Sequence, residues 1–222
     1  WTGQIAVLMG DFLLARALCI LVEVGNLQAL GIVSRATERL SIGEIFEIQI
    51  GDQRDTREES YFAMVSDKTA SLISAAARIG PILVGADDEV VRSMGRYGEL
   101  LGRAFQVADD ILDLTSDEAT MGKPVGHDLR EGKITLPLIC ALRCAPGARR
   151  AEMEALLARP HKIEDEWGQI VAFVEEYEGV KAAAETAREY AAQAQKCLGV
   201  LAPSPAREAL ELAVRLVVER NN

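Results

Sequence analysis

Helical periodicity runs through almost the whole chain and limits its fold more than any other feature. Ala, Leu, Glu and Arg are abundant, aromatic residues make up only 5%, and no stretch alternates strictly between apolar and polar side chains for six residues. Strong helix formers without strand alternation predict an all-α fold. We expect helices at about 3–24, 26–40, 41–51, 57–79, 87–115, 134–145, 149–158, 163–175, 178–199 and 204–219.

Local signals set the boundaries between these helices. Ser41 and Glu44 have the spacing of a capping box, which predicts that a helix begins at this point. Thr56 is placed to cap the helix that follows it, and Gly80 marks the end of that helix. Only the Gly-rich stretch 116–133 is predicted to form a long loop. A long loop in a tightly helical chain is more often functional than idle.

Two classes of function are disfavoured by the charge pattern. The most apolar stretch, Ile5 to Val24, is interrupted by Asp11, Arg16 and Glu23, which predicts no transmembrane segment. Lys and Arg total 24 against 34 Asp and Glu, a net charge of −10. Nucleic-acid binding needs clustered positive charge, so we expect no nucleic-acid partner. A few local cations or metal ions must therefore hold any anionic ligand.

The cysteines and the first residue bear on location and completeness. The four cysteines are too few and too scattered for a disulfide framework, and a reducing, cytoplasmic location fits them best. The chain begins at Trp1, inside a predicted apolar helix, and not at Met. We therefore expect Trp1 to be an internal residue of a longer protein.

Acidic residues near the end of the predicted helix at 87–115 form the most informative pattern. The spacing i, i+3, i+4 and i+7 places four residues on one helix face: Gln106, Asp109, Asp110 and Asp113. Three carboxylates on one face repel each other unless cations lie between them. Oxygen ligands without His or Cys favour Mg²⁺, with Mn²⁺ as a second possibility, over zinc. A solvated acidic surface cluster is the alternative that this pattern alone leaves open.

Basic residues follow in the predicted loop. Lys123, Arg130 and Lys133 surround Asp128 in the sequence. A loop that carries cations beside a magnesium site could close over a diphosphate and neutralise the charge of a leaving group. An ordinary charged loop is the alternative, but two Gly-Lys pairs ten residues apart favour the functional interpretation.

A third candidate lies in the middle of the predicted helix at 57–79. Lys68 and Thr69 are followed there by the apolar residues Ala70, Leu72 and Ile73. The lysine could extend its amine to solvent along this apolar surface, which is the simplest interpretation. It could instead serve a site, and the residues alone do not separate the two.

Several motifs, in the same order, resemble those of the trans-isoprenyl diphosphate synthases. Residues 102–113 and 122–137 look like the second aspartate-rich motif and the lysine loop of that family. Residues 6–17 resemble its Gly-Asp helix, and residues 66–72 its Lys-Thr helix. Gly43 to Gln49 (Gly-Glu-x₄-Gln) and the last helix at 213–220 are also similar. The resemblance covers essentially the whole chain, and the motif residues are most similar to those of bacterial medium- and long-chain members of the family.

The resemblance implies a single all-α domain over residues 1–222, an isoprenoid synthase-type bundle of helices around a deep central cavity, usually in a homodimer. It implies a Mg²⁺-dependent prenyltransferase that condenses an allylic diphosphate with isopentenyl diphosphate, head to tail and in trans. The products are a longer polyprenyl diphosphate and pyrophosphate. Family members carry a first aspartate-rich motif upstream of the Gly-Asp helix, and this chain begins after the place where it should be.

The resemblance also implies a role for each candidate residue. Asp109 would be the main Mg²⁺ ligand, and Asp110 and Asp113 would complete the acidic face. Three lysines would bind the diphosphate: Lys68, Lys123 and Lys133. Thr69 and Gln106 would lie near the developing carbocation, and Asp128 would orient the lysine loop.

Two other functions compete with catalysis. Some members of the family are non-catalytic partner subunits that regulate an active chain, and the missing first motif would suit that role. The intact set of Lys68, Gln106, Asp109 and Lys133 argues against it. A related terpene cyclase or squalene-type synthase fits the two Gly-Lys elements poorly. The residues upstream of Trp1 would discriminate best, because an Asp-Asp-x-x-Asp followed by arginines identifies the synthase.

Overall fold

The computed structural model describes residues 2–115, 126–159 and 164–219, and these residues are helical with no strand among them. The first half contains α1 (Gly3–Val24), α2 (Leu27–Gln53), α3 (Glu58–Val65), the π-helix η1 (Ser66–Ala70), α4 (Ser71–Leu83) and α5 (Asp88–Thr115). The second half contains α7 (His127–Arg130), α8 (Leu136–Cys144), α9 (Gly147–Leu157), α10 (Glu164–Glu176), α11 (Gly179–Cys197), the 3₁₀ turn η2 (Leu198–Val200) and α12 (Pro205–Glu219). The all-α prediction is confirmed.

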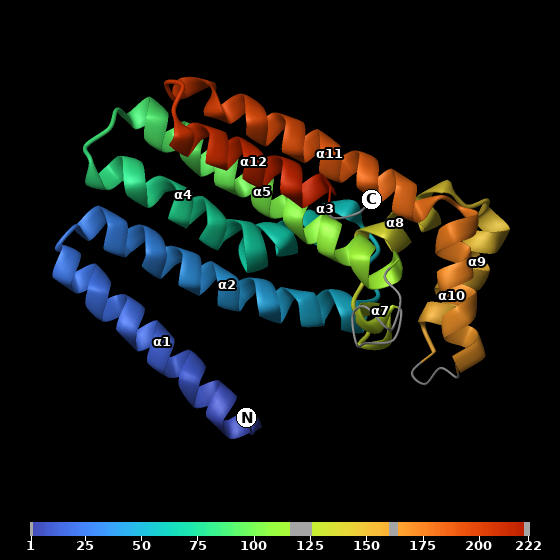
Figure 1. The fold of residues 1–222 in the computed structure, drawn as a ribbon. Helices are drawn as coiled ribbons and strands as arrows, with labels where there is room; N and C mark the ends of the chain where they lie inside the picture. The colour runs from blue at the N-terminus through green and yellow to red at the C-terminus, as the bar shows by residue number, and fades with distance from the viewer. Residues whose placement is uncertain (1, 116–125, 160–163, 220–222) are drawn as a thin grey trace.

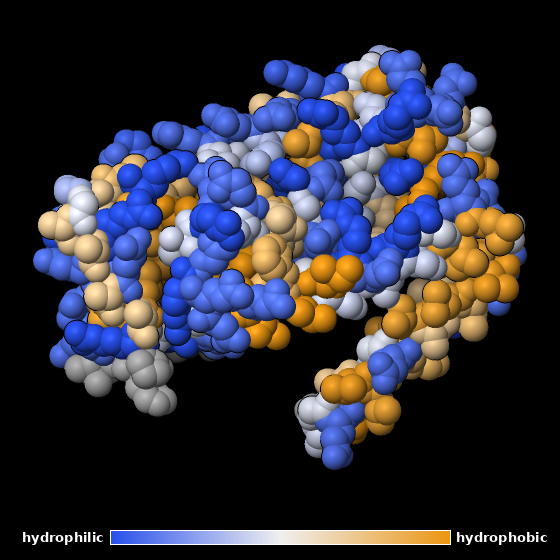
Figure 2. Space-filling model, turned by 180° about the vertical axis from the view of Figure 1, so that it is seen from behind, coloured by the Kyte–Doolittle hydropathy of each residue, from blue (hydrophilic) through white to orange (hydrophobic). Residues whose placement is uncertain are grey.

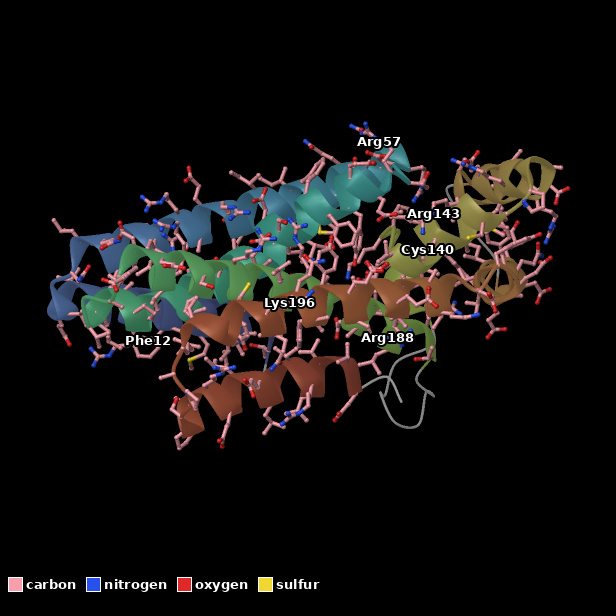
Figure 3. All side chains as sticks on the ribbon, turned by 90° about the horizontal axis from the view of Figure 1, so that it is seen from above. Phe12, Arg57, Cys140, Arg143, Arg188 and Lys196 are labelled. Carbon is pink, nitrogen blue, oxygen red and sulfur yellow. The ribbon has the colours of Figure 1, made fainter. Side chains whose placement is uncertain are left out.

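The long helices lie side by side around α5 (Figure 1). Helices α4 and α11 pack along α5, α2 packs along α4, and α12 lies next to α11. Helices α9 and α10 stand across one end of this bundle. At that end the core contains buried side chains from α5, α8 and α10, among them Val107, Leu136, Leu138 and Phe173. The ion pair between Arg143 of α8 and Glu58 of α3 links two elements at the surface of this region (Figure 3).

Helix α1 differs from the others because none of its residues is buried. It diverges from the bundle, and apolar side chains cover much of its surface (Figure 2). Its mean hydropathy reaches 2.3 over 18 residues, so by length and composition it could cross a membrane, the one such helix among the described residues. Core helices and signal sequences meet the same criteria. The predicted absence of a transmembrane segment is therefore not confirmed.

Two helix boundaries differ from the sequence analysis. The predicted break at Ser41 is wrong, because α2 is continuous and the Ser41 hydroxyl donates to the carbonyl of Thr37, one turn earlier. Arg57, and not Thr56, occupies the cap position of α3. The Asp55 carboxylate there accepts hydrogen bonds from the Arg57 backbone N–H and from the Ser60 hydroxyl.

Two further segments also differ from the prediction. The segment predicted as one helix over 57–79 is interrupted by η1 and then continues through Pro81 to Leu83. The short helix α7 occupies part of the predicted loop at 116–133, whose residues 116–125 lie outside the described range. The described residues carry grooves of about 200 to 490 Å³. The deep central cavity implied by the resemblance stays a prediction.

Candidate functional site

Lys68 and Thr69 lie in η1, a widened turn between α3 and α4. Such π-helical turns occur often at functional sites, because they re-aim side chains within a helix. Two glycines allow neighbouring helices to approach this turn closely. A Cβ on Gly43 of α2 would lie 2.4 Å from the Lys68 backbone nitrogen, and one on Gly102 of α5 would lie 2.5 Å from Ala70 Cα. The turn is therefore held between the backbones of α2 and α5.

A line of hydrogen bonds connects this turn to α5 and α3. The Thr69 hydroxyl donates to Gln106 Oε1 at 2.8 Å, and Gln106 Nε2 donates to Asp110 Oδ1 at 3.0 Å. The Tyr61 hydroxyl donates to Asp110 Oδ2 at 2.6 Å. Each donor has one acceptor in this line, so the orientations of Thr69 and Gln106 are set by a buried carboxylate.

Asp110 is buried, with only 3% of its surface exposed. Burial raises its pKa to about 7, and the hydrogen bonds from Tyr61 and Gln106 oppose that shift. The Leu136 backbone N–H also points to this carboxylate, at 3.4 Å. Both oxygens therefore have partners within the core. This placement does not suit the predicted role as a metal ligand on an open face, and it suits a role in positioning Gln106.

Asp113 of α5 also has hydrogen-bond partners, at the start of α7. Its carboxylate accepts a hydrogen bond from the Asp128 backbone N–H at 3.1 Å, and its own carbonyl accepts one from Gly126. Burial and the negative charge of Asp128 raise its pKa. Asp113 thus caps the N-terminus of α7 from a different helix, where the unpaired backbone N–H groups attract negative charge.

Asp109 is the exposed member of the acidic set. It makes no hydrogen bond or ion pair with the residues that the structure describes. The predicted single acidic face of α5 is therefore divided: Asp110 is buried, Asp113 is hydrogen-bonded to α7, and Asp109 is exposed. Among the described residues, no three His, Cys, Asp or Glu side chains gather as a metal site. The Asp109 carboxylate is still the type of oxygen ligand that Mg²⁺ prefers.

Lys68 does not extend freely into solvent. Its ammonium group lies 2.7 Å from Glu47 Oε2 and 3.5 Å from Glu44 Oε2, and only 21% of its side chain is exposed. Both glutamates are on α2, where Glu44 directly follows Gly43 and Glu47 lies one turn after it. The close approach at Gly43 thus brings a half-buried cation against two carboxylates.

Lys133 follows α7 and forms ion pairs with Asp128 at 2.7 Å and with Glu131 at 3.0 Å. Burial opposes its charge, but the hydrogen bonds to these two carboxylates outweigh burial and raise its pKa. The predicted neighbourhood of Asp128 and Lys133 is present in the structure. Lys123, the third predicted lysine, lies outside the described residues.

A groove of about 490 Å³ lies between α2 and the segment of residues 131–133, called here the lysine segment. Glu47 and Lys133 both line it, together with Arg54 and Gly132. The Gly132 carbonyl lies against α2, 2.8 Å from where a Cβ on Gly51 would be. Glu47 therefore pairs with Lys68 and shares this groove with Lys133, although 65 positions separate the two lysines in the sequence.

Sequence reasoning missed two residues of this site. Glu47 is the acidic partner of Lys68, and its signal was its position one turn after Gly43 in the Gly-Glu-x₄-Gln motif. Tyr61 had no signal, because a tyrosine in an amphipathic helix is most often a core residue. The partner that makes it functional, Asp110, is 49 positions away.

Comparison with known proteins places this arrangement in one family. The family model described as Polyprenyl synthetase matches residues 1–174. The chain is 37% identical over 220 residues to an all-trans-nonaprenyl-diphosphate synthase (geranyl-diphosphate specific) of Rhodobacter capsulatus, covering 99% of this chain and 67% of that protein. It is 36% identical to a nonaprenyl diphosphate synthase of Mycobacterium tuberculosis, covering 100% of this chain and 65% of that protein.

Comparison with solved structures gives the same family. The polyprenyl synthase of Caulobacter crescentus, complexed with calcium and isoprenyl diphosphate, superposes with a TM-score of 0.91 at 34% identity, over 100% of this chain and 68% of that one. The chain thus spans about two thirds of the length of these proteins. The family match covers most of the chain, and the relatives share its fold. The chain therefore belongs to the polyprenyl synthetase family.

Proposed function

We propose that this chain is part of a trans-polyprenyl diphosphate synthase, which condenses an allylic diphosphate with isopentenyl diphosphate. The bond between the allylic carbon and its diphosphate oxygen breaks, and pyrophosphate leaves. The double bond of isopentenyl diphosphate supplies the electron pair of the new carbon–carbon bond, and a proton is then lost. Family membership supports this reaction, and so do relatives named as nonaprenyl diphosphate synthases.

The observation that carries the proposal is the convergence of η1, α5 and the lysine segment. Lys68 is paired with Glu47, and Glu47 lines the same groove as Lys133. A diphosphate there could take the place of the carboxylate partners of both lysines through charge-assisted hydrogen bonds. Thr69 gives its hydroxyl hydrogen to Gln106, so its oxygen lone pairs are left to face a developing carbocation. Fixed dipoles of this kind stabilise charge that appears only in the transition state.

We propose Mg²⁺ as the metal, held in part by Asp109. Its exposed carboxylate is a hard oxygen ligand at the open end of α5. The Caulobacter polyprenyl synthase holds calcium, which supports the use of a divalent cation. When bound, Mg²⁺ would neutralise diphosphate oxygens and so improve the leaving group.

The test measures Mg²⁺-dependent incorporation of radiolabelled isopentenyl diphosphate by the purified full-length protein of which this chain is part. Asp109→Ala should lower turnover by about 100- to 1,000-fold, the scale of losing one preorganised electrostatic group. Because Asp109 is exposed and unpaired among the described residues, the free energy of unfolding should not fall. Asp165→Ala, at an exposed position of α10, is the matched control and should keep normal turnover. Near-normal turnover of the Asp109 variant would exclude the metal assignment.

A non-catalytic partner subunit remains the alternative, and the same assay separates the two. A partner subunit would bind a diphosphate but incorporate no isopentenyl units unless an active chain is added. We further propose a homodimer in the cytoplasm, which sedimentation and fractionation can check.

A further inference from the structure

A second groove lies between α2 and α4 and has no role in the proposed reaction. Its volume is about 200 Å³. Since a liquid water occupies about 30 Å³, it has room for a phosphate-sized anion with a few waters. Arginines and small residues line it: Ile32, Arg35, Ala36, Arg39, Ser71, Ser74, Ala75 and Arg78. None of these residues belongs to the site described above, so the inference does not rest on the proposed function.

Glycines make room for two of these arginines. The Arg35 guanidinium lies over Gly31, where an added Cβ would be 3.4 Å from Nη1. The Arg78 side chain lies against Gly95 of α5, where an added Cβ would be 2.8 Å from Cδ. An added Cβ at Gly95 would push the Arg78 side chain away, whereas one at Gly31 would only make ordinary van der Waals contact with Arg35. The local packing thus fits the arginines closely.

Three positive charges meet one negative charge in this groove. Arg39 is paired with Asp67 at 2.6 Å and also donates to the Ser66 carbonyl. Within the described part of the chain, Arg35 and Arg78 have no carboxylate partner. Like charges placed together are costly unless an anion lies between them. This excess is unusual in a protein with a net charge of −10.

The serine hydroxyls of the groove are already committed as donors. Ser71 donates to the Asp67 carbonyl, and Ser74 donates to the Gly95 carbonyl. The guanidinium N–H groups are therefore the donors that remain for a ligand. Guanidinium forks match the oxygens of phosphate and carboxylate groups, and phosphate carries the larger charge.

We propose that Arg35, Arg39 and Arg78 form a binding site for a phosphate-class dianion, either free phosphate or a phosphomonoester. The site lies between α2 and α4, which also position Gly43 and η1. An anion bound there would bridge the two helices by pairing with arginines from both.

The test is titration with inorganic phosphate and, separately, with glycerol phosphate, by calorimetry without divalent metal. The double variant Arg35→Gln/Arg78→Gln should weaken binding at least tenfold. Arg188→Gln removes one positive charge from α11, away from the groove (Figure 3), and should leave binding unchanged. Binding of inorganic phosphate assigns the free ion, and binding of glycerol phosphate alone assigns a monoester. Equal affinity of the double variant and the original protein would overturn the proposal.

A second variant keeps every charge. Gly95→Ala would displace the flexible end of Arg78, so it should weaken phosphate binding, whereas Gly168→Ala, at a position with open space, should not. Loss of binding in Lys133→Ala instead would place the ion in the 490 Å³ groove and contradict the proposal. If the protein binds no phosphate but the double variant dissociates a dimer, the groove holds a carboxylate of a second copy, and the proposal is wrong.

Discussion

Replacing Gly43 by alanine tests whether the backbone contact between α2 and η1 positions the site. A Cβ at this position would lie 2.4 Å from the Lys68 nitrogen, 2.7 Å from its Cα and 2.8 Å from its Cβ. Ordinary van der Waals contact begins at 3.4 Å, so the two elements must separate by roughly 1 Å. The nearest atoms belong to the backbone, which cannot turn away as the end of a flexible side chain can.

The expected magnitude combines two opposing effects. Alanine in place of glycine inside a helix stabilises by about 0.5–1 kcal/mol. Overpacking a tight contact costs about 1–3 kcal/mol. We therefore expect Gly43→Ala to lower the free energy of unfolding by about 1–2 kcal/mol. Turnover should fall by about 100-fold, because a displacement of 1 Å in catalytic groups has this effect.

Urea unfolding and steady-state prenyl transfer measure the two quantities. Gly168→Ala is the control, because a Cβ there meets nothing within 4 Å and should stabilise the protein slightly while leaving turnover unchanged. A Gly43→Ala protein as stable and as active as its parent would refute the idea that this contact holds Lys68 in place.

Two further predictions concern buried and capping interactions. Tyr61→Phe should destabilise by about 1–3 kcal/mol in urea unfolding, because it removes the closest donor to the buried Asp110 carboxylate and leaves its Oδ2 only the Leu136 N–H at 3.4 Å. Tyr190→Phe removes only a 3.5 Å contact and should cost less. Asp55→Ala should cost about 1 kcal/mol at neutral pH. The hydrogen bond from Arg57 lowers the Asp55 pKa, so this stabilisation is present above about pH 4 and lost as the pH falls further. A difference between parent and variant that grows on acidification would contradict the assignment.

The helices that sequence reasoning predicted correctly are those with strong apolar periodicity. Helix α5 was expected at 87–115 and runs from Asp88 to Thr115. The predicted break at Ser41 failed for a physical reason. Capping-box spacing predicts a helix start only where the serine backbone is not helical. Here α2 is continuous, and the Ser41 hydroxyl donates to the Thr37 carbonyl of the same helix.

The π-helix at 66–70 could not be predicted, since a widened turn changes the hydrogen-bond pattern and not the residue types. The sequence could not predict, either, that Asp109 and Asp110 would lie in different environments. Neighbouring residues on a helix point about 100° apart. Packing of Tyr61 from α3 decides that Asp110 turns inward, while Asp109 stays exposed. Spacing on one helix identifies a candidate face but not which side of it the rest of the fold will cover.

The pairing of Lys68 with Glu47 shows the same limit. Each residue lies in a motif of its own segment, and neither motif predicts the contact between the two residues. Their contact depends on the close approach of α2 at Gly43, which is a property of two helices together. Long-range contacts of this kind determine the geometry of a site, and the residues of either segment alone do not predict them.

The most direct test of the central claim measures pyrophosphate release and isopentenyl incorporation in the same reaction. The purified full-length protein, of which this chain is part, is given an allylic diphosphate, radiolabelled isopentenyl diphosphate and Mg²⁺. The account predicts one pyrophosphate released for each isopentenyl unit incorporated, with both signals lost on removing the metal. Binding of both substrates without incorporation or pyrophosphate release would contradict it and identify a non-catalytic member of the family.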